Sequence, residues 1–175
     1  MPDYRAYIDG VLDGSVVSCH WARRAVERHV DDLEHGEARG LYFDDEAADH
    51  AISFFSFLRH SKGEWAGSPL ILEPWQQFIQ AMLFGWMREG PDGALLRRFR
   101  VAYIEVPRKN GKTTMAAGDG LYLFDADGEP GAEVYTAATK RDQARISHGE
   151  ATRMVKASPF LRRHIDVRRD NRRLP

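Results

Sequence analysis

The chain has 175 residues, of which 43% are hydrophobic, enough for about one domain with a buried core and too many for a disordered segment. A lone cysteine, Cys19, permits no internal disulfide, and the seven histidines show no metal-ligand spacing. The N-terminus lacks a secretory signal, and the longest uncharged run, residues 74–87, is too short to cross a bilayer. We therefore expect a globular cytosolic protein.

The net charge of −1 hides a gradient along the chain. Residues 1–50 hold 12 Asp and Glu against 5 Lys and Arg, whereas residues 138–175 hold 11 Lys and Arg against 4 Asp and Glu. A basic end on a near-neutral chain predicts that any contact with a polyanion is local. A charge run of this kind is more often a solvated face, but arginines near the C-terminus could contact a DNA backbone. They are Arg162, Arg163, Arg168, Arg169, Arg172 and Arg173.

Three helices are expected in the first half of the chain. The first covers residues 19–33. The second covers residues 45–60, where Asp44 or Asp45 can cap the helix and apolar residues recur at helical spacing. The third begins at Pro74, a residue well suited to a first turn, and ends near residue 88, before a turn-rich stretch.

The second half alternates between strand and helix patterns. Residues 99–106 form a compact apolar run that predicts a strand, and residues 112–124 predict a helix after it. A second strand is expected at residues 133–138 and a second helix at residues 141–157. Strand, helix, strand, helix in this order indicates an α/β fold with a parallel sheet.

A phosphate-binding loop is expected at residues 107–113, between the first of these strands and its helix. There the lysine of Gly111-Lys112-Thr113 can reach the β and γ oxygens of a nucleotide, and the threonine hydroxyl can bind Mg²⁺. The usual pattern has an earlier glycine where this chain has Val106. The alternative interpretation is an ordinary loop.

A second candidate binding motif is Pro-Trp-Gln-Gln at residues 74–77. The amide of Gln76 both donates and accepts hydrogen bonds, so it can pair with the adjacent donor and acceptor on the edge of adenine. Gln77 is the alternate candidate. The competing interpretation places Trp75 in the core and leaves both glutamines facing water.

Together these motifs make the chain resemble the ATPase domain of tailed-phage terminase large subunits. The likeness rests on Pro-Trp-Gln, on Val-Pro-Arg-Lys-Asn-Gly-Lys-Thr some thirty residues later, and on Ala-Ala-Thr-Lys-Arg-Asp-Gln-Ala from residue 137. It implies a P-loop NTPase of the additional-strand (ASCE) type whose sheet is incomplete here. Residues 1–68 would form a helical N-terminal region, and residues 69–175 would begin the ATPase domain.

The resemblance also assigns roles to individual residues. It implies that Gln76 reads adenine, that Lys112 neutralises the β and γ phosphates, and that Thr113 holds Mg²⁺. Arg108 matches an arginine proposed to touch the γ-phosphate, or it is a simple counter-charge. The implied ATP site comprises Trp75, Gln76, Arg108, Lys109, Asn110, Gly111, Lys112, Thr113 and Thr114.

An ATPase of this class also needs a Walker B strand that ends in acidic residues. Residues 121–125 imitate one, but Asp125 lies only 13 positions after Lys112, which leaves no room for a crossover between parallel strands. We therefore expect the Walker B motif, the coupling motif and a nuclease domain beyond residue 175. The fragment alone would not turn over ATP.

The resemblance further implies partners and a location. These are double-stranded DNA, a terminase small subunit, a portal protein and further copies in a ring, in the cytoplasm of a bacterial host. Two alternatives stay open: another DNA-dependent, helicase-like P-loop ATPase, and a truncated module that binds nucleotide without catalysis. Downstream acidic residues would separate the first from a terminase.

Overall fold

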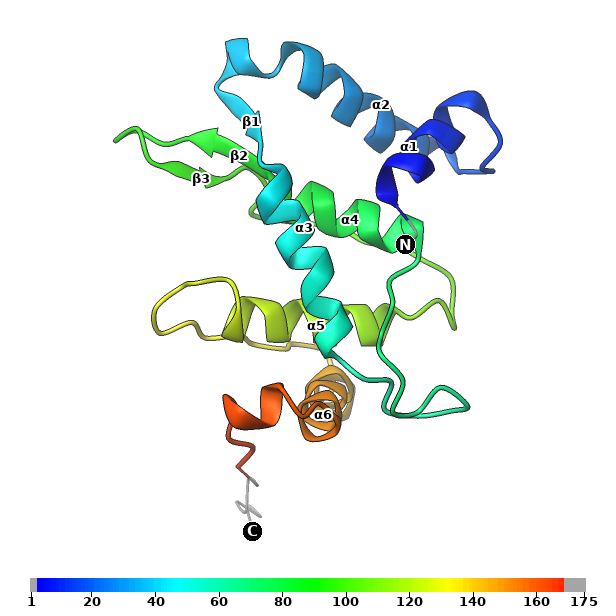
Figure 1. The fold of residues 1–175 in the computed structure, drawn as a ribbon, viewed down its shortest axis with the longest axis vertical. Coiled ribbons are helices and arrows are strands. Elements are labelled where there is room, and N and C mark those ends of the chain that lie inside the picture. Colours follow the sequence, from blue (N-terminus) through cyan, green and yellow to red (C-terminus); the bar gives the residue numbers. More distant parts are fainter. Residues whose placement is uncertain (1–2, 169–175) are drawn as a thin grey trace. The chain divides into compact units, whose positions relative to one another are not determined.

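The computed structural model describes residues 3–168. The chain forms two compact units, each built from two separate stretches of sequence. Unit 1 comprises Met1–Ser53 and Ile71–Glu105, and unit 2 comprises Phe54–Leu70 and Val106–Pro175. Figure 1 labels the α-helices and strands of both units, which are described separately below.

Unit 1 is mainly helical. Asp3 starts its first helix by accepting a hydrogen bond from the backbone N–H of Arg5, and Gly14 ends that helix in the left-handed conformation. Asp44 starts the third helix by accepting from the N–H of Ala47. The helices are α1 (Tyr4–Asp13), α2 (His20–His35), the short η1 (Glu37–Arg39), α3 (Asp45–Phe54) and α4 (Pro74–Gly85).

A small antiparallel sheet completes unit 1. Its strands are β1 (Leu41–Phe43), β2 (Trp86–Glu89) and β3 (Leu95–Arg97), in the order β1-β2-β3. Phe43 lies opposite Trp86, and their rings meet edge-on with centroids 5.2 Å apart. Because side chains alternate between the faces of a sheet, Leu41 lies on the same face as this pair, and all three pack into the core.

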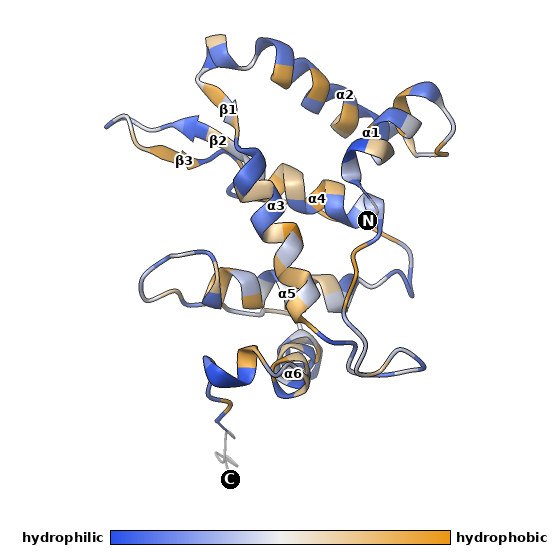
Figure 2. Ribbon diagram, viewed as in Figure 1, coloured by the Kyte–Doolittle hydropathy of each residue, from blue (hydrophilic) through white to orange (hydrophobic). Residues whose placement is uncertain are grey.

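The core of unit 1 lies where α1, α2 and α4 meet. Figure 2 shows α4 as predominantly hydrophobic, whereas α2 alternates hydrophobic and hydrophilic patches, as expected for a helix with one buried side. His29 is buried in this core, where its Nδ1 accepts a hydrogen bond of 3.1 Å from Trp86 Nε1. The cluster consists of Tyr4, Ile8, Val11, Val26, Ala48, Phe78, Ala81, Met82 and Trp86.

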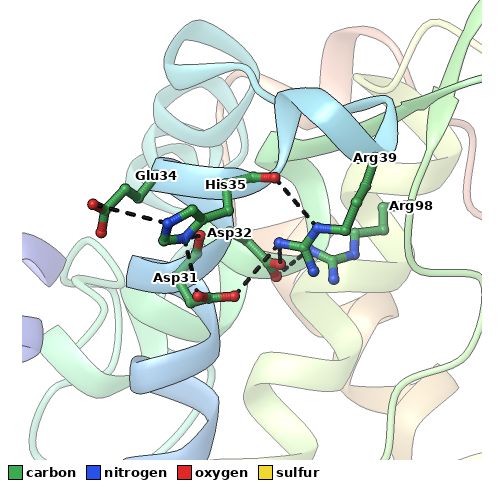
Figure 3. Close-up of polar contacts among 6 residues, drawn as sticks. All are labelled: Asp31, Asp32, Glu34, His35, Arg39 and Arg98. Atoms are coloured by element: carbon green, nitrogen blue, oxygen red, sulfur yellow. Dashed lines mark hydrogen bonds and ion pairs between the residues drawn. The ribbon is translucent and has the colours of Figure 1, made fainter.

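A buried carboxylate joins α2 to later parts of unit 1. The side chain of Asp32 is 1% exposed and accepts hydrogen bonds from Arg39, at 2.7 Å, and from Arg98. Figure 3 shows both guanidinium groups converging on it. Asp31, on the same helix, is 60% exposed and lies 3.5 Å from Arg39. Asp32 thus connects α2, η1 and the end of the β2–β3 hairpin.

Unit 2 is built around two helices, α5 (Lys112–Asp125) and α6 (Arg141–Ala157), with the short η2 (Phe55–Phe57) and η3 (Leu161–Arg163). Gly118 lets α5 approach Phe55 closely, because a Cβ at that position would lie 2.3 Å from Phe55 Cε1. Ser158 Oγ, at the end of α6, donates a 2.7 Å hydrogen bond to the carbonyl of Phe57.

A second polar cluster ties α6 to the loop that follows η2. Glu150 accepts hydrogen bonds from Ser61 Oγ and from Arg153 Nη2. Burial tends to raise the pKa of Glu150, but these hydrogen bonds outweigh it, so the pKa lies below its ordinary value. Glu150 is therefore held as a carboxylate with its partners in place.

The predicted helices are largely confirmed. Residues 19–33 correspond to α2, residues 112–124 to α5 and residues 141–157 to α6. The helix predicted at residues 45–60 ends sooner, since α3 stops at Phe54 and a tighter turn, η2, follows. The helix from Pro74 also ends sooner, at Gly85, where the chain enters β2.

The two predicted strands are not formed. Residues 99–106 and 133–138 contain neither helix nor strand, because a strand exists only where its backbone groups pair with a neighbour. Each segment keeps an accessible aromatic side chain: Tyr103 is 87% exposed and Tyr135 is 81% exposed. The parallel sheet inferred from the alternating pattern is therefore absent from residues 3–168. Helices with a small antiparallel sheet, consistent with an incomplete α/β domain, stand in its place.

The rejection of a Walker B strand at residues 121–125 is confirmed, because these residues form the last turn of α5 and Asp125 ends that helix. The ASCE type and the domain boundary near residue 69 remain predictions. Of the arginines near the C-terminus, Arg169, Arg172 and Arg173 lie outside the described residues.

Candidate nucleotide-binding site

The N-terminus of α5 presents unpaired backbone donors. The first N–H groups of any helix lack a partner within the helix, and they carry partial positive charge. Here the residue that precedes the helix is Gly111, which offers no side chain to cap them, and the first turn contains no acidic residue. The end of α5 is therefore suited to an anion.

The loop before α5 has an unusual backbone. Lys109 has φ of 69°, the one non-glycine residue with positive φ among residues 3–168, and Gly111 has φ of 72°. Two left-handed residues separated by one position turn the chain sharply back into the helix. Such a conformation is costly for a residue with a Cβ, as at Lys109, and is more often found at functional sites than elsewhere.

Internal hydrogen bonds hold this loop together. Lys112 Nζ donates to the carbonyl of Val106 at 2.8 Å, which joins the two ends of the loop. Asn110 Nδ2 donates to the carbonyls of Pro107, at 3.4 Å, and of Arg108, at 3.3 Å. The ammonium of Lys112 is thus fixed over the loop by a contact that a stronger acceptor can replace.

The loop is strongly cationic. Arg108, Lys109 and Lys112 are exposed, and residues 106–118 contain no Asp or Glu. The side chains of Arg108 and Lys109 make no ion pair with any described residue. Thr113 is half-buried in the first turn of α5, and its hydroxyl makes no hydrogen bond within residues 3–168. Backbone donors, three cations and a hydroxyl together suit a polyphosphate bound with a divalent cation.

Trp75 and Gln76 lie at the start of α4, in unit 1. Both side chains are half-buried, so Trp75 is not a core residue. Gln76 Oε1 accepts a 2.9 Å hydrogen bond from the N–H of Glu73, and Glu73 caps the N–H of Gln76 in return. Gln77 is buried and donates to the carbonyl of Leu72 at 2.9 Å. The interpretation in which both glutamines face water is wrong.

The structure gathers residues 108–114 into one loop and first turn, whereas Trp75 and Gln76 belong to the other unit. A role for those two residues in binding adenine remains a prediction. Sequence reasoning missed the reciprocal cap at the start of α4. The signal was present, because Glu73 precedes Pro74 and a glutamine follows three residues after Glu73, which is the spacing of a capping box.

Metal-binding clusters and membrane spans are not found among residues 3–168. Residues 3–168 contain no group of three or more His, Cys, Asp or Glu side chains that could hold a metal ion. No helix in the described part of the chain is both long and apolar enough to span a membrane.

Comparison with known proteins identifies the family. The family described as "Terminase large subunit, ATPase domain" matches residues 74–173, more than half of the chain. The chain belongs to the terminase large-subunit ATPase family. The match includes both the start of α4 and the cationic loop, so the resemblance inferred from these two motifs is confirmed.

A curated terminase supports this assignment. The chain is 29% identical over 115 residues to the "Terminase, large subunit" of Enterobacteria phage HK97. This match covers 65% of the chain and 21% of the phage protein, so the chain spans about a fifth of the length of the curated relative it matches. No solved structure matches the chain.

Proposed function

We propose that this chain is the nucleotide-binding part of a DNA-packaging ATPase and that it binds ATP with Mg²⁺ through residues 107–114. The observation that carries the proposal is the N-terminus of α5, where uncapped backbone donors and Lys112 meet in a loop without acidic residues. Membership of the terminase family supports ATP as the ligand.

Each side chain of the loop has a distinct part in this proposal. Lys112 exchanges the carbonyl of Val106 for phosphate oxygens, and a charged acceptor makes the stronger hydrogen bond. Arg108 extends into solvent, where its planar guanidinium can contact the terminal phosphate and stabilise charge in the transition state. Thr113 offers its hydroxyl oxygen as one ligand for Mg²⁺, which neutralises phosphate charge when bound.

In the same proposal Gln76 reads the base. Its oxygen already accepts from Glu73, but its amide nitrogen makes no hydrogen bond within residues 3–168 and remains available as a donor. Trp75 beside it is half-buried and offers an aromatic face. A donor alone can contact one acceptor of adenine, so we expect less than the full discrimination of a bidentate pair.

The test of the proposal is nucleotide binding by the 175-residue chain. Lys112→Ala removes the ammonium while leaving the backbone of α5 unchanged, and we expect it to abolish binding of fluorescent ATP in the presence of Mg²⁺. Lys156→Ala, at an exposed position on α6, is the matched control and should bind as the unaltered chain does. Undiminished ATP binding by Lys112→Ala would overturn the proposal.

Base selectivity tests the role of Gln76 separately. Gln76→Ala should weaken ATP more than GTP, by less than the ~1–3 kcal/mol of a bidentate contact. Because this change also removes a cap, Gln76→Glu is the control: it keeps an oxygen for the N–H of Glu73 but lacks the amide donor. Equal losses for both nucleotides would assign Gln76 to capping alone.

The remaining elements of the proposal concern the whole protein. In the full-length subunit, ATP hydrolysis drives double-stranded DNA into a procapsid, in the cytoplasm of a bacterial host. A ring of copies, a portal protein and a terminase small subunit are the partners that this role requires. The present chain binds nucleotide without sustained turnover, which is why binding is the quantity to measure.

A further inference from the structure

The two units carry opposite charge. Unit 1 holds 9 Lys and Arg against 16 Asp and Glu, whereas unit 2 holds 16 Lys and Arg against 10 Asp and Glu. The excess of positive charge therefore lies in the unit that contains the cationic loop. The loop contributes three of the Lys and Arg residues of unit 2. Its proposed role in nucleotide binding therefore does not account for most of the positive charge of this unit.

Three of these cations line one side of α6. At about 100° per residue, Arg141, Arg145 and Lys156 fall within an arc of about 60° on the helix surface. All three are exposed. The acidic residues of α6 lie outside this arc, because Asp142 is about 100° and Glu150 about 180° from Arg141. We call Arg141, Arg145 and Lys156 the basic stripe.

No member of the basic stripe is engaged within the protein. Their side chains make no ion pair and no hydrogen bond with any residue from 3 to 168. Some other cations of the chain are paired: Arg39 and Arg98 bind Asp32, and Arg153 binds Glu150. Glu150 is buried and already held by Arg153 and Ser61, so it cannot neutralise the stripe.

We propose that the basic stripe of α6 binds the phosphate backbone of double-stranded DNA. The stripe is about 22 Å long from Arg141 to Lys156 at about 1.5 Å per residue. Each strand of a duplex carries one phosphate about every 3.4 Å along the duplex axis, so a length of about 22 Å contains about six phosphates of one strand. Three long, unpaired cations can reach phosphates at that spacing without any base contact, which predicts binding that does not depend on sequence.

The choice of duplex DNA over other polyanions rests on the proposed function, while the stripe itself rests on the geometry of α6. The two can fail separately. The cationic loop binds one nucleotide through Lys112. The basic stripe binds a polymer, and none of its three residues takes part in the hydrogen bonds that hold the loop together. A variant of one site should therefore leave the other ligand's binding unchanged.

The experiment measures anisotropy of a labelled, random-sequence duplex with the 175-residue chain between about 50 and 200 mM salt. Each phosphate that a Lys or Arg neutralises adds about 0.9 to the slope of log K against log salt. The double variant Arg145→Ala/Lys156→Ala should therefore reduce the slope by about 1.8 and weaken binding equally for unrelated sequences. Its circular dichroism and its affinity for ATP should not change.

The matched control is Arg24→Ala/Arg100→Ala, which removes the same charge from two exposed, unpaired arginines of unit 1. We expect it to keep the slope of the unaltered chain. The inference is overturned if the α6 double variant keeps that slope, or if the control loses as much. It is also overturned if the chain binds anionic phosphatidylserine vesicles through the stripe but does not bind the duplex. Loss of ATP binding in Lys112→Ala with the duplex slope intact supports two separate sites.

Discussion

Replacing Gly118 by alanine tests how α5, and with it the cationic loop, is positioned in unit 2. The new Cβ would lie 2.3 Å from Phe55 Cε1, 2.8 Å from Phe55 Cζ and 3.1 Å from Leu58 Cδ1. Carbon atoms in contact prefer about 3.5–4.0 Å, so the ring must move by more than an ångström. Phe55 is 1% exposed, and a closely packed neighbourhood leaves it little room to do so.

Two effects of the substitution oppose each other. Alanine in place of glycine in a helix interior stabilises by about 1 kcal/mol, whereas overpacking a core costs about 1–3 kcal/mol. Because the clash is severe and the neighbour is a rigid ring, the larger cost applies. We expect Gly118→Ala to lower the free energy of unfolding by about 2 kcal/mol.

The same helix provides a matched control. A Cβ at Gly120 would meet Val134 Cγ1 at 3.5 Å, an ordinary contact, so Gly120→Ala should stabilise by up to about 1 kcal/mol. The assay is urea unfolding followed by circular dichroism. With a slope of about 2 kcal/mol per molar urea, the midpoint of Gly118→Ala should fall by about 1 M. A midpoint at or above that of the unaltered chain, with Gly120→Ala raised as expected, would refute the close packing of α5 on Phe55.

Two further predictions concern unit 1. Asp32→Asn should destabilise the chain by about 3–5 kcal/mol, because it leaves Arg98 without its buried, charged partner. Asp31→Asn, at a 60% exposed position, should cost at most about 1 kcal/mol. Equal urea midpoints for the two variants would contradict this difference. Burial lowers the pKa of His29 from 6.5 to about 4. Between these two pKa values the unfolded chain therefore binds more protons than the folded chain. The free energy of unfolding should fall by about 3 kcal/mol as the pH drops from about 7 to about 4. His29→Gln, which keeps an acceptor for Trp86, should remove this component of the pH dependence.

Helices and caps were predictable because their signals are local. The apolar spacing of α3, its cap at Asp44, and the proline at the start of α4 all act within one or two turns. The helix at residues 45–60 was predicted too long because its apolar spacing continues through Phe55 and Leu58. Periodicity alone does not register the tightening of the chain into η2.

The buried polar contacts were not predictable, because each joins residues far apart in sequence. Asp32 meets Arg98 across 66 positions, and Glu150 meets Ser61 across 89. Nothing in the residues near Asp32 distinguishes it from Asp31, one position away. One carboxylate is buried and the other is exposed only because of where α2 lies on the rest of unit 1.

Strand formation also depends on residues that are far apart in sequence. The strands β1 and β2 form between segments more than forty residues apart, and β1 is only three residues long, too short for an alternating pattern to be visible. Residues 99–106 carry a clear strand signal, a compact apolar run, yet they remain unpaired within the described chain. Strand propensity describes how well the residues of a segment suit a strand. The strand itself forms only when the backbone of a partner segment pairs with it.

The cationic loop keeps its conformation although no sheet supports it among residues 3–168. Its hydrogen bonds all lie within residues 106–112, and the turn depends on Lys109, Asn110 and Gly111. A site whose shape is determined over seven consecutive residues can be inferred from the sequence, even when the strand expected before it is not formed. The positioning of Gln76, which we propose reads the base from 36 positions before Lys112, depends instead on how distant segments pack. For this reason we expect phosphate binding to tolerate changes elsewhere in the fold, while base selectivity should be sensitive to them.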